Sequence, residues 1–279
     1  MSTFFSSNIP FQKVTHGTAV FNLPVHYYRD DSFLLFYTAD PQRVRHLLPS
    51  SKLHPILLPG NRTIVGAAAF NYIDTGIGPY GEIGLVIPVV YSTKTPRTLW
   101  PAILESRYPG FGVLVMHLPV TKTVARDAGR GHWGYTKFIA DMTFTITPEF
   151  MECRMKEDHR DILTLRVARK GIPVRDKQPL VTYSVLNNNL IKTVIPQIGS
   201  FRLSLTPKES FLSLGDHPVA ESFRRLGLGR SPLLSRYYLE RSAMLPAGEV
   251  IETGVRPLDG YIGKDREGIH EIRYLDAAG

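Results

Sequence analysis

The stretch GRGHWGYTKFIADMTFTIT, residues 129–147, combines glycines, aromatic rings and an alternating strand pattern. From Thr136 to Thr147 the residues alternate with a period of two, which predicts a β-strand. One face of this strand would carry Phe138, Ala140, Met142, Phe144 and Ile146. The other would carry Lys137, Ile139, Asp141, Thr143 and Thr145. We expect the first face to enter the core and the second to line a cavity, with Lys137 at its open end behind a loop of glycines.

Similar strand-like runs extend in both directions from this stretch. They include residues 32–38, 63–73, 81–91 and 111–118, and more follow as far as residue 207, with turns rich in Gly, Pro, Asn and Asp between them. Helices are expected at 40–49 and 216–227, each with an aspartate N-cap and an early proline, and as a short turn at 123–129. This pattern predicts an α+β, mainly β, fold as one domain over residues 1–279, a barrel or sandwich with a few outer helices.

Composition limits the functional classes. With 43% hydrophobic and 21% charged residues, the chain is typical of a soluble globular protein. Its single cysteine, Cys153, cannot form an internal disulfide, which suits a reducing compartment. The N-terminus has no signal-peptide pattern, and no apolar run is long enough to span a membrane, so we expect a cytoplasmic protein. The net charge of +8 comes from scattered Lys and Arg without a nucleic-acid-binding motif, so no nucleic-acid partner is expected.

Lys137 is a candidate nucleophile. A neutral lysine amine attacks a ketone to form a Schiff base, which draws electrons from the neighbouring carbon. Burial disfavours the charged ammonium form of a lysine and so favours the reactive amine. Trp133, Tyr135 and Ile139 would help to exclude water. The alternative is an ordinary surface lysine at the end of a strand.

Glu82 stands at the start of a second strand pattern, GEIGLVIPV, residues 81–89. Alternation would place Glu82 and Gly84 on one face of this strand and Ile83 and Leu85 on the other. The small Gly84 leaves room for a ligand, and a carboxylate there would orient a substrate or move a proton. A charged strand end in contact with solvent is the alternative.

Together these stretches resemble the acetoacetate decarboxylase family. PYGEIGLVIPV, residues 79–89, is similar to its Tyr-x-Glu motif, and GRGHWGYTKF, residues 129–138, to the segment that carries its lysine. The segments 27–49 and 220–251 are similar to its N- and C-terminal parts. The resemblance implies a cone-shaped antiparallel β-barrel with a flanking sheet and a few outer helices, no cofactor, and a homo-oligomer.

The resemblance also implies residue roles. Lys137 falls on the Schiff-base lysine, Glu82 on the glutamate of the pocket, and Arg29 on the arginine that binds the substrate carboxylate. Four further side chains are expected to contact the substrate, namely Tyr80, Met116, Trp133 and Tyr135. No metal is expected, because the nine histidines show no H-x-H or HExxH spacing.

Three positions depart from the family pattern. The second lysine is replaced by Phe138, the motif glutamate by Gly131, and an upstream acidic residue by Ala67. Three functions therefore remain open. The first is a lyase that decarboxylates a β-keto acid through Lys137, and the second is a Schiff-base aldolase, dehydratase or hydrolase acting on 2-keto acids. The third is a non-catalytic protein that binds a small acid or lipid.

Overall fold

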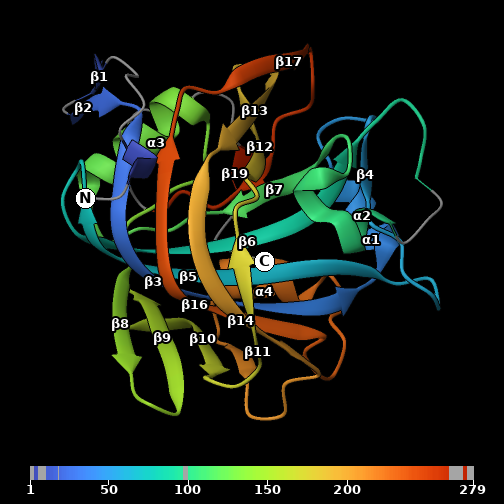
Figure 1. Ribbon diagram of the computed structural model, residues 1–279. Helices are drawn as coiled ribbons and strands as arrows, with labels where there is room; N and C mark the ends of the chain where they lie inside the picture. Colours follow the sequence, from blue (N-terminus) through green and yellow to red (C-terminus); the bar gives the residue numbers. More distant parts are fainter. Residues whose placement is uncertain (1–2, 6–10, 18, 97–99, 264–272, 275–279) are drawn as a thin grey trace.

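The computed structural model describes residues 3–5, 11–17, 19–96, 100–263 and 273–274 (Figure 1). The strands are β1 Gln12–His16, β2 Ala19–Leu23, β3 Val25–Ala39, β4 Leu53–Pro55, β5 Thr63–Thr75, β6 Tyr80–Tyr91, β7 Phe111–His117, β8 Asp141–Ile146, β9 Phe150–Glu157, β10 Arg160–Ala168, β11 Ile172–Asp176, β12 Leu180–Leu186, β13 Asn189–Ile195, β14 Gln197–Leu205, β15 Phe211–Leu214, β16 Leu234–Leu245, β17 Glu249–Thr253, β18 Asp259–Gly260 and β19 Arg273–Tyr274. The helices are α1 Pro41–Leu47, α2 Trp100–Leu104, α3 Thr123–Trp133 and α4 Pro218–Arg224, with 3-10 turns η1 Thr3–Phe5 and η2 Glu105–Arg107.

One long sheet dominates the described part of the chain. Its strand order is β11-β14-β16-β3-β5-β6-β7-β12-β13-β17, with β4 paired to β6. The pairs are antiparallel except for β7 with β12. β13 ends at Ile195 and β14 begins at Gln197, so Pro196 alone separates two strands near opposite ends of this order. The sheet therefore curves until its flanks meet at Pro196.

The expected barrel closure is not confirmed. The described strands give an open order whose two ends, β11 and β17, are not paired with each other. At Pro196 the flanks are joined by the chain itself, and proline lacks the N–H that a continued ladder needs. The mainly β character, the flanking sheet and the outer helices agree with the sequence-based expectation.

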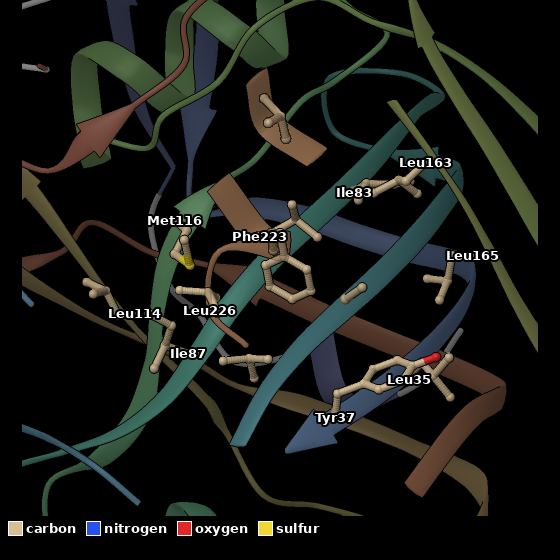
Figure 2. Close-up of a cluster of buried hydrophobic side chains, with 14 of the residues drawn as sticks. Leu35, Tyr37, Ile83, Ile87, Leu114, Met116, Leu163, Leu165, Phe223 and Leu226 are labelled. Carbon is tan, nitrogen blue, oxygen red and sulfur yellow. The ribbon is translucent and has the colours of Figure 1, made fainter. Parts of the chain in front are cut away.

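The two faces of the long sheet have different roles. One face packs against a four-stranded sheet, β15-β10-β9-β8, which lies at the bottom of Figure 1. Figure 2 shows part of the core between them, where Ile83 lies near Leu163 and where Phe223 of α4 lies above β6. The opposite face lines a cavity and is partly covered by α3 and the β1–β2 hairpin.

Three local expectations need correction. β8 begins at Asp141 rather than Thr136, and α3 extends to Trp133, so the expected glycine loop is mostly helix. The second expected helix is capped by His217, not Asp216, because the His217 ring accepts the Val219 N–H. Asp40 does cap α1, accepting the N–H of Gln42.

Candidate active site

Glu82 projects from β6 into the cavity. Every second residue of this strand lines the cavity, in the order Glu82, Gly84, Val86 and Pro88. The residues between them belong to the core between the two sheets. This is the alternation that the sequence predicts, and both faces of β6 are buried because each is covered by protein. The chain thus carries a carboxylate on an otherwise apolar central strand, at a position that leaves Glu82 only 6% exposed.

Lys137 lies in an extended segment between α3 and β8. Residues 118–120 hold this segment through three backbone hydrogen bonds. Leu118 N–H donates to Thr136 O at 3.1 Å, Val120 N–H to Phe138 O at 2.9 Å, and Ala140 N–H to Val120 O at 3.0 Å. Val120 forms bridges with both Glu82 and Ile139. The segment 118–120 is therefore the spacer that brings β6 and the lysine segment together, although Glu82 and Lys137 are 55 residues apart.

Gly129 of α3 makes room for the lysine side chain. A Cβ on Gly129 would lie 2.4 Å from Lys137 Cε and 2.5 Å from Cδ. Gly134 ends the helix with a φ of +67°, the left-handed conformation that favours glycine. Buried Arg130 of the same helix donates from Nε to the Lys137 carbonyl at 2.6 Å. The glycines and Arg130 together fix where the lysine stem leaves the backbone.

Lys137 and Glu82 form a buried ion pair. Lys137 Nζ donates to Glu82 Oε2 at 2.5 Å, and Lys137 is 5% exposed. Glu82 Oε1 also accepts the hydroxyl of Tyr72 at 3.2 Å. Hydrogen bonds between ionised groups are stronger than neutral ones, and a low-dielectric site strengthens them further. The arrangement places a proton acceptor directly on the amine.

Tyrosine hydroxyls surround this pair. The pKa of Tyr72 and that of Tyr80 are raised well above the usual range, mainly by burial and also by nearby acidic groups including Glu82. Burial also raises the pKa of Tyr135 to about 12. These side chains are protonated at neutral pH and can donate. Tyr135 hydrogen-bonds to Thr182 across 2.8 Å, and Tyr27 to Tyr80 across 3.1 Å.

A second polar network lines another part of the cavity. Arg241, 6% exposed, donates from Nη1 to Asp30 Oδ2 at 2.7 Å and from Nε to Gln197 Oε1 at 3.1 Å. Asp176 accepts from Gln197 Nε2 at 2.8 Å and from the Tyr238 hydroxyl at 2.7 Å. Burial raises the pKa of Tyr72, whereas the charge of Arg241 lowers it. Arg241 is therefore close enough to act electrostatically on a side chain that contacts Glu82.

The structure separates the other residues expected at the site. Tyr135 lines the cavity, whereas Tyr80, Met116 and Trp133 do not. Met116 belongs to the core between the sheets (Figure 2), because its neighbours Val113 and Val115 take the cavity-facing positions of β7. Trp133 donates its indole N–H to Pro246 O at 2.8 Å. The Tyr80 ring centre is 5.9 Å from Lys137 Nζ.

Arg29 is not in the cavity. It is exposed on β3, where the register with β5 shifts on both sides of it. Such a bulge puts an extra residue into the strand and reverses the alternation. Strict alternation from Tyr27, which lines the cavity, would have turned Arg29 inward. The bulge instead buries Asp30, the partner of Arg241.

The described residues offer no obvious metal site. No three His, Cys, Asp or Glu side chains among them come together in a way that would hold a metal ion. Cys153 is fully buried, and burial raises the pKa of its thiol. No helix in the described ranges is long and apolar enough to cross a membrane.

The sequence pattern of the acetoacetate decarboxylase family matches residues 8–253. The chain belongs to the acetoacetate decarboxylase family. No curated protein sequence matches it significantly.

Solved structures share the fold. The acetoacetate decarboxylase of Legionella pneumophila is 20% identical with a TM-score of 0.63, covering 90% of this chain and 94% of that one. An acetoacetate decarboxylase-like enzyme of Sphingomonas wittichii is 14% identical with a TM-score of 0.58, covering 82% and 94%. The enduracididine biosynthesis enzyme MppR, solved with pyruvate, is 11% identical with a TM-score of 0.58, covering 86% and 92%.

Proposed function

We propose that this protein is a cofactor-independent lyase that decarboxylates a β-keto acid through a Schiff base on Lys137. The observation that carries the proposal is the buried pair of Lys137 Nζ and Glu82 Oε2, 2.5 Å apart in a cavity of a decarboxylase-family fold. An amine becomes a nucleophile only after it loses a proton, and Glu82 is in hydrogen-bond contact to accept it.

The residues present are sufficient for each step. The Lys137 amine adds to the ketone, and the carbinolamine loses water after Glu82 returns the proton to its hydroxyl. The iminium then accepts the electron pair of the breaking carbon–carbon bond as CO2 leaves. The resulting enamine takes a proton on carbon from the Tyr72 hydroxyl, which regains a proton from water, and water then hydrolyses the iminium to release the ketone and the free amine. Tyr72, bonded to Glu82 at 3.2 Å, keeps the carboxylate oriented throughout.

Arg241 is our candidate for the substrate carboxylate, in place of Arg29. It is buried, lines the cavity and acts electrostatically on Tyr72. Its contacts with Asp30 and Gln197 use Nη1 and Nε. A guanidinium carries five N–H donors in a planar fork, which suits a carboxylate.

An aldol or dehydration reaction on a 2-keto acid is the second candidate. The same lysine would form the Schiff base, and the tyrosines at the site favour this reaction because their hydroxyls stay protonated. Such reactions need an acid that protonates a leaving oxygen, and Tyr72 and Tyr135 supply neutral donors. CO2 release distinguishes the two candidates.

Borohydride trapping tests the proposal. The protein is incubated with acetoacetate or with pyruvate, reduced, and analysed by intact and peptide mass. We expect an isopropyl group on Lys137 after acetoacetate, because CO2 has left before reduction, and no adduct in Lys137→Ala. Lys122, which donates to the Ile77 carbonyl at 2.7 Å, offers the matched control variant Lys122→Ala, which should still trap.

Each other result has a definite meaning. An adduct that retains the carboxylate with acetoacetate, or trapping of pyruvate alone, would support the aldol or dehydration reaction. Absence of any adduct with either acid and with acetone would reject Schiff-base chemistry and favour a binding protein. We also propose that the protein is cytoplasmic and forms a homo-oligomer. Exposed Ile172 and Leu205 on the paired strands β11 and β14 support the oligomer, and light scattering would measure its mass.

A further inference from the structure

The cavity extends well beyond the reactive pair as an apolar channel. We call this channel the apolar arm, and its walls include Leu34 and Phe36 of β3, Ile64 of β5, Val86 and Pro88 of β6, and Val113 of β7. On β6 the cavity-facing residues run from Glu82 to Pro88, six positions apart. At a rise of ~3.3 Å per residue the arm is about 20 Å long, far longer than acetoacetate needs.

Strand register shows how the arm begins and what forms its floor. Beside Glu82, the small residues Gly84 and Ala68 are directly paired on β6 and β5. One step further, Val86 is paired with Gly66, and a Cβ on Gly66 would lie 2.7 Å from the Phe36 ring. The Phe36 ring thus lies across Gly66. Next to Glu82 the arm is lined by small residues, and farther along it is lined by aromatic or aliphatic side chains.

The charged side chains beside the arm are paired with partners of opposite charge. Arg241 is paired with Asp30, and Arg236, which is opposite Leu34 in the pairing of β16 with β3, is paired with Glu105. Leu34, Phe36 and Val113 remain only half-buried. An apolar ligand that covers the walls of the arm gains ~25 cal/mol of binding free energy for each Å² of apolar surface removed from water.

We propose that the apolar arm binds the aliphatic tail of the substrate, so that the substrate is a 3-oxo acid with a medium-length alkyl chain. This inference rests on the proposed function, because it needs the ketone at Lys137 and the carboxylate toward Arg241. The tail then extends along β6 past Gly84 toward Pro88. The products are CO2 and a methyl ketone that retains the tail.

A chain-length series tests the inference. CO2 release is measured for acetoacetate, 3-oxohexanoate, 3-oxooctanoate and 3-oxodecanoate. Burial of each methylene gives ~0.8 kcal/mol, which corresponds to about a fourfold gain in kcat/KM per carbon. We expect kcat/KM to rise about 15-fold with each added pair of carbons until the arm is full. A Val86→Phe variant should narrow the arm and lower the ratio of the kcat/KM for 3-oxooctanoate to that for acetoacetate at least tenfold.

The control variant is Val194→Phe, because Val194 is 41% exposed on β13 and the next residue, Ile195, is the one that lines the cavity. It should leave the ratio unchanged. Trapping of acetone on Lys137 separates the two hypotheses. If acetone is trapped but kcat/KM is flat or falls with chain length, the arm does not bind the tail and this inference fails. If no ketone is trapped at all, the proposed function itself has failed.

Discussion

Gly129 lies eight residues before Lys137, and its lack of a side chain leaves the space through which the lysine side chain reaches Glu82. A Gly129→Ala variant would place a methyl group 2.4 Å from Lys137 Cε, inside the lysine stem. The amine must then leave Glu82, so we predict at least a tenfold loss of borohydride trapping. Misplacing a reacting group by about 1 Å is enough for such losses.

Gly131→Ala is the matched control in the same helix. Its methyl group would collide with the His16 side chain, 2.5 Å from Nδ1 and 2.9 Å from Cβ, and not with Lys137. Both variants replace glycine by alanine in α3, so their effects on helix propensity are equal in kind. Equal trapping by the two variants would contradict the idea that Gly129 makes room for the lysine.

Glu82 supplies the counter-charge that allows the Lys137 ammonium group to remain buried. We predict that Glu82→Gln lowers the free energy of unfolding by about 3 kcal/mol, because it leaves the Lys137 ammonium buried without a counter-charge. Turnover should fall ~100-fold or more, since the proton acceptor is lost. Urea unfolding and CO2 release measure the two effects.

The double variant Glu82→Gln, Lys137→Met provides the decisive comparison. Removing the ammonium as well should restore most of the lost stability, because a buried pair replaced by apolar groups is often neutral. It should restore no turnover. A double variant as unstable as the single one would mean that Glu82 acts through packing rather than charge.

At the scale of elements, the sequence predicts which side chains share a face of a regular central strand. It does not predict where a strand becomes irregular. On β6 the period of two correctly indicates that Glu82 and Gly84 share the cavity face. On β3 the placement of Arg29 at the site, which rests on the family resemblance, fails because a bulge arises from pairing with β5 and leaves no local sequence signal. The glycines of α3 suggest a loop, yet their cause is tertiary contact with residues such as Lys137 and His16.

The site residues that sequence reasoning missed lie on other strands. Tyr72 of β5 reaches Glu82, and Arg241 of β16 is placed by sheet curvature. Neither stands in a motif that points to chemistry. The only available signal was period-two spacing, which places Tyr72 with Phe70 on one face of β5 but does not identify that face as the cavity.

The C-terminal end of α3 gives a prediction at this scale. Gly134→Ala would put a methyl group 2.1 Å from the Val185 carbonyl oxygen, with a φ of +67°. We predict a loss of more than 2 kcal/mol in urea unfolding, from both conformational strain and collision with the backbone. Gly60→Ala is the control, because Gly60 has a φ of +73° but open space around its Cα. It should lose only about 1 kcal/mol, and equal losses would exclude the collision.

At the scale of the whole molecule, the curved sheet needs cover on both faces, and a histidine of the sheet lies buried beneath one cover. His117 of β7 is completely buried and contacts Ser222 of α4 at 2.9 Å, while its Nδ1 has no hydrogen-bond partner. Burial, and to a smaller extent the charge of His217, lowers the pKa of His117 to about 3. The folded protein therefore keeps this imidazole neutral across the range in which an unfolded chain would protonate it.

The stability of the whole fold should thus depend on pH through His117. In the unfolded chain its pKa is ~6.5, so below that value the unfolded state binds a proton that the folded state refuses. The stabilisation is complete above about pH 6.5 and is lost as the pH falls toward 3, at up to ~1.4 kcal/mol per pH unit. We predict that His117 makes the free energy of unfolding in urea ~2 kcal/mol lower at pH 5 than at pH 7. In His117→Gln, which does not titrate, the difference between these two pH values should shrink by that amount. An unchanged difference would mean that other groups, not this histidine, set the acid sensitivity of the fold.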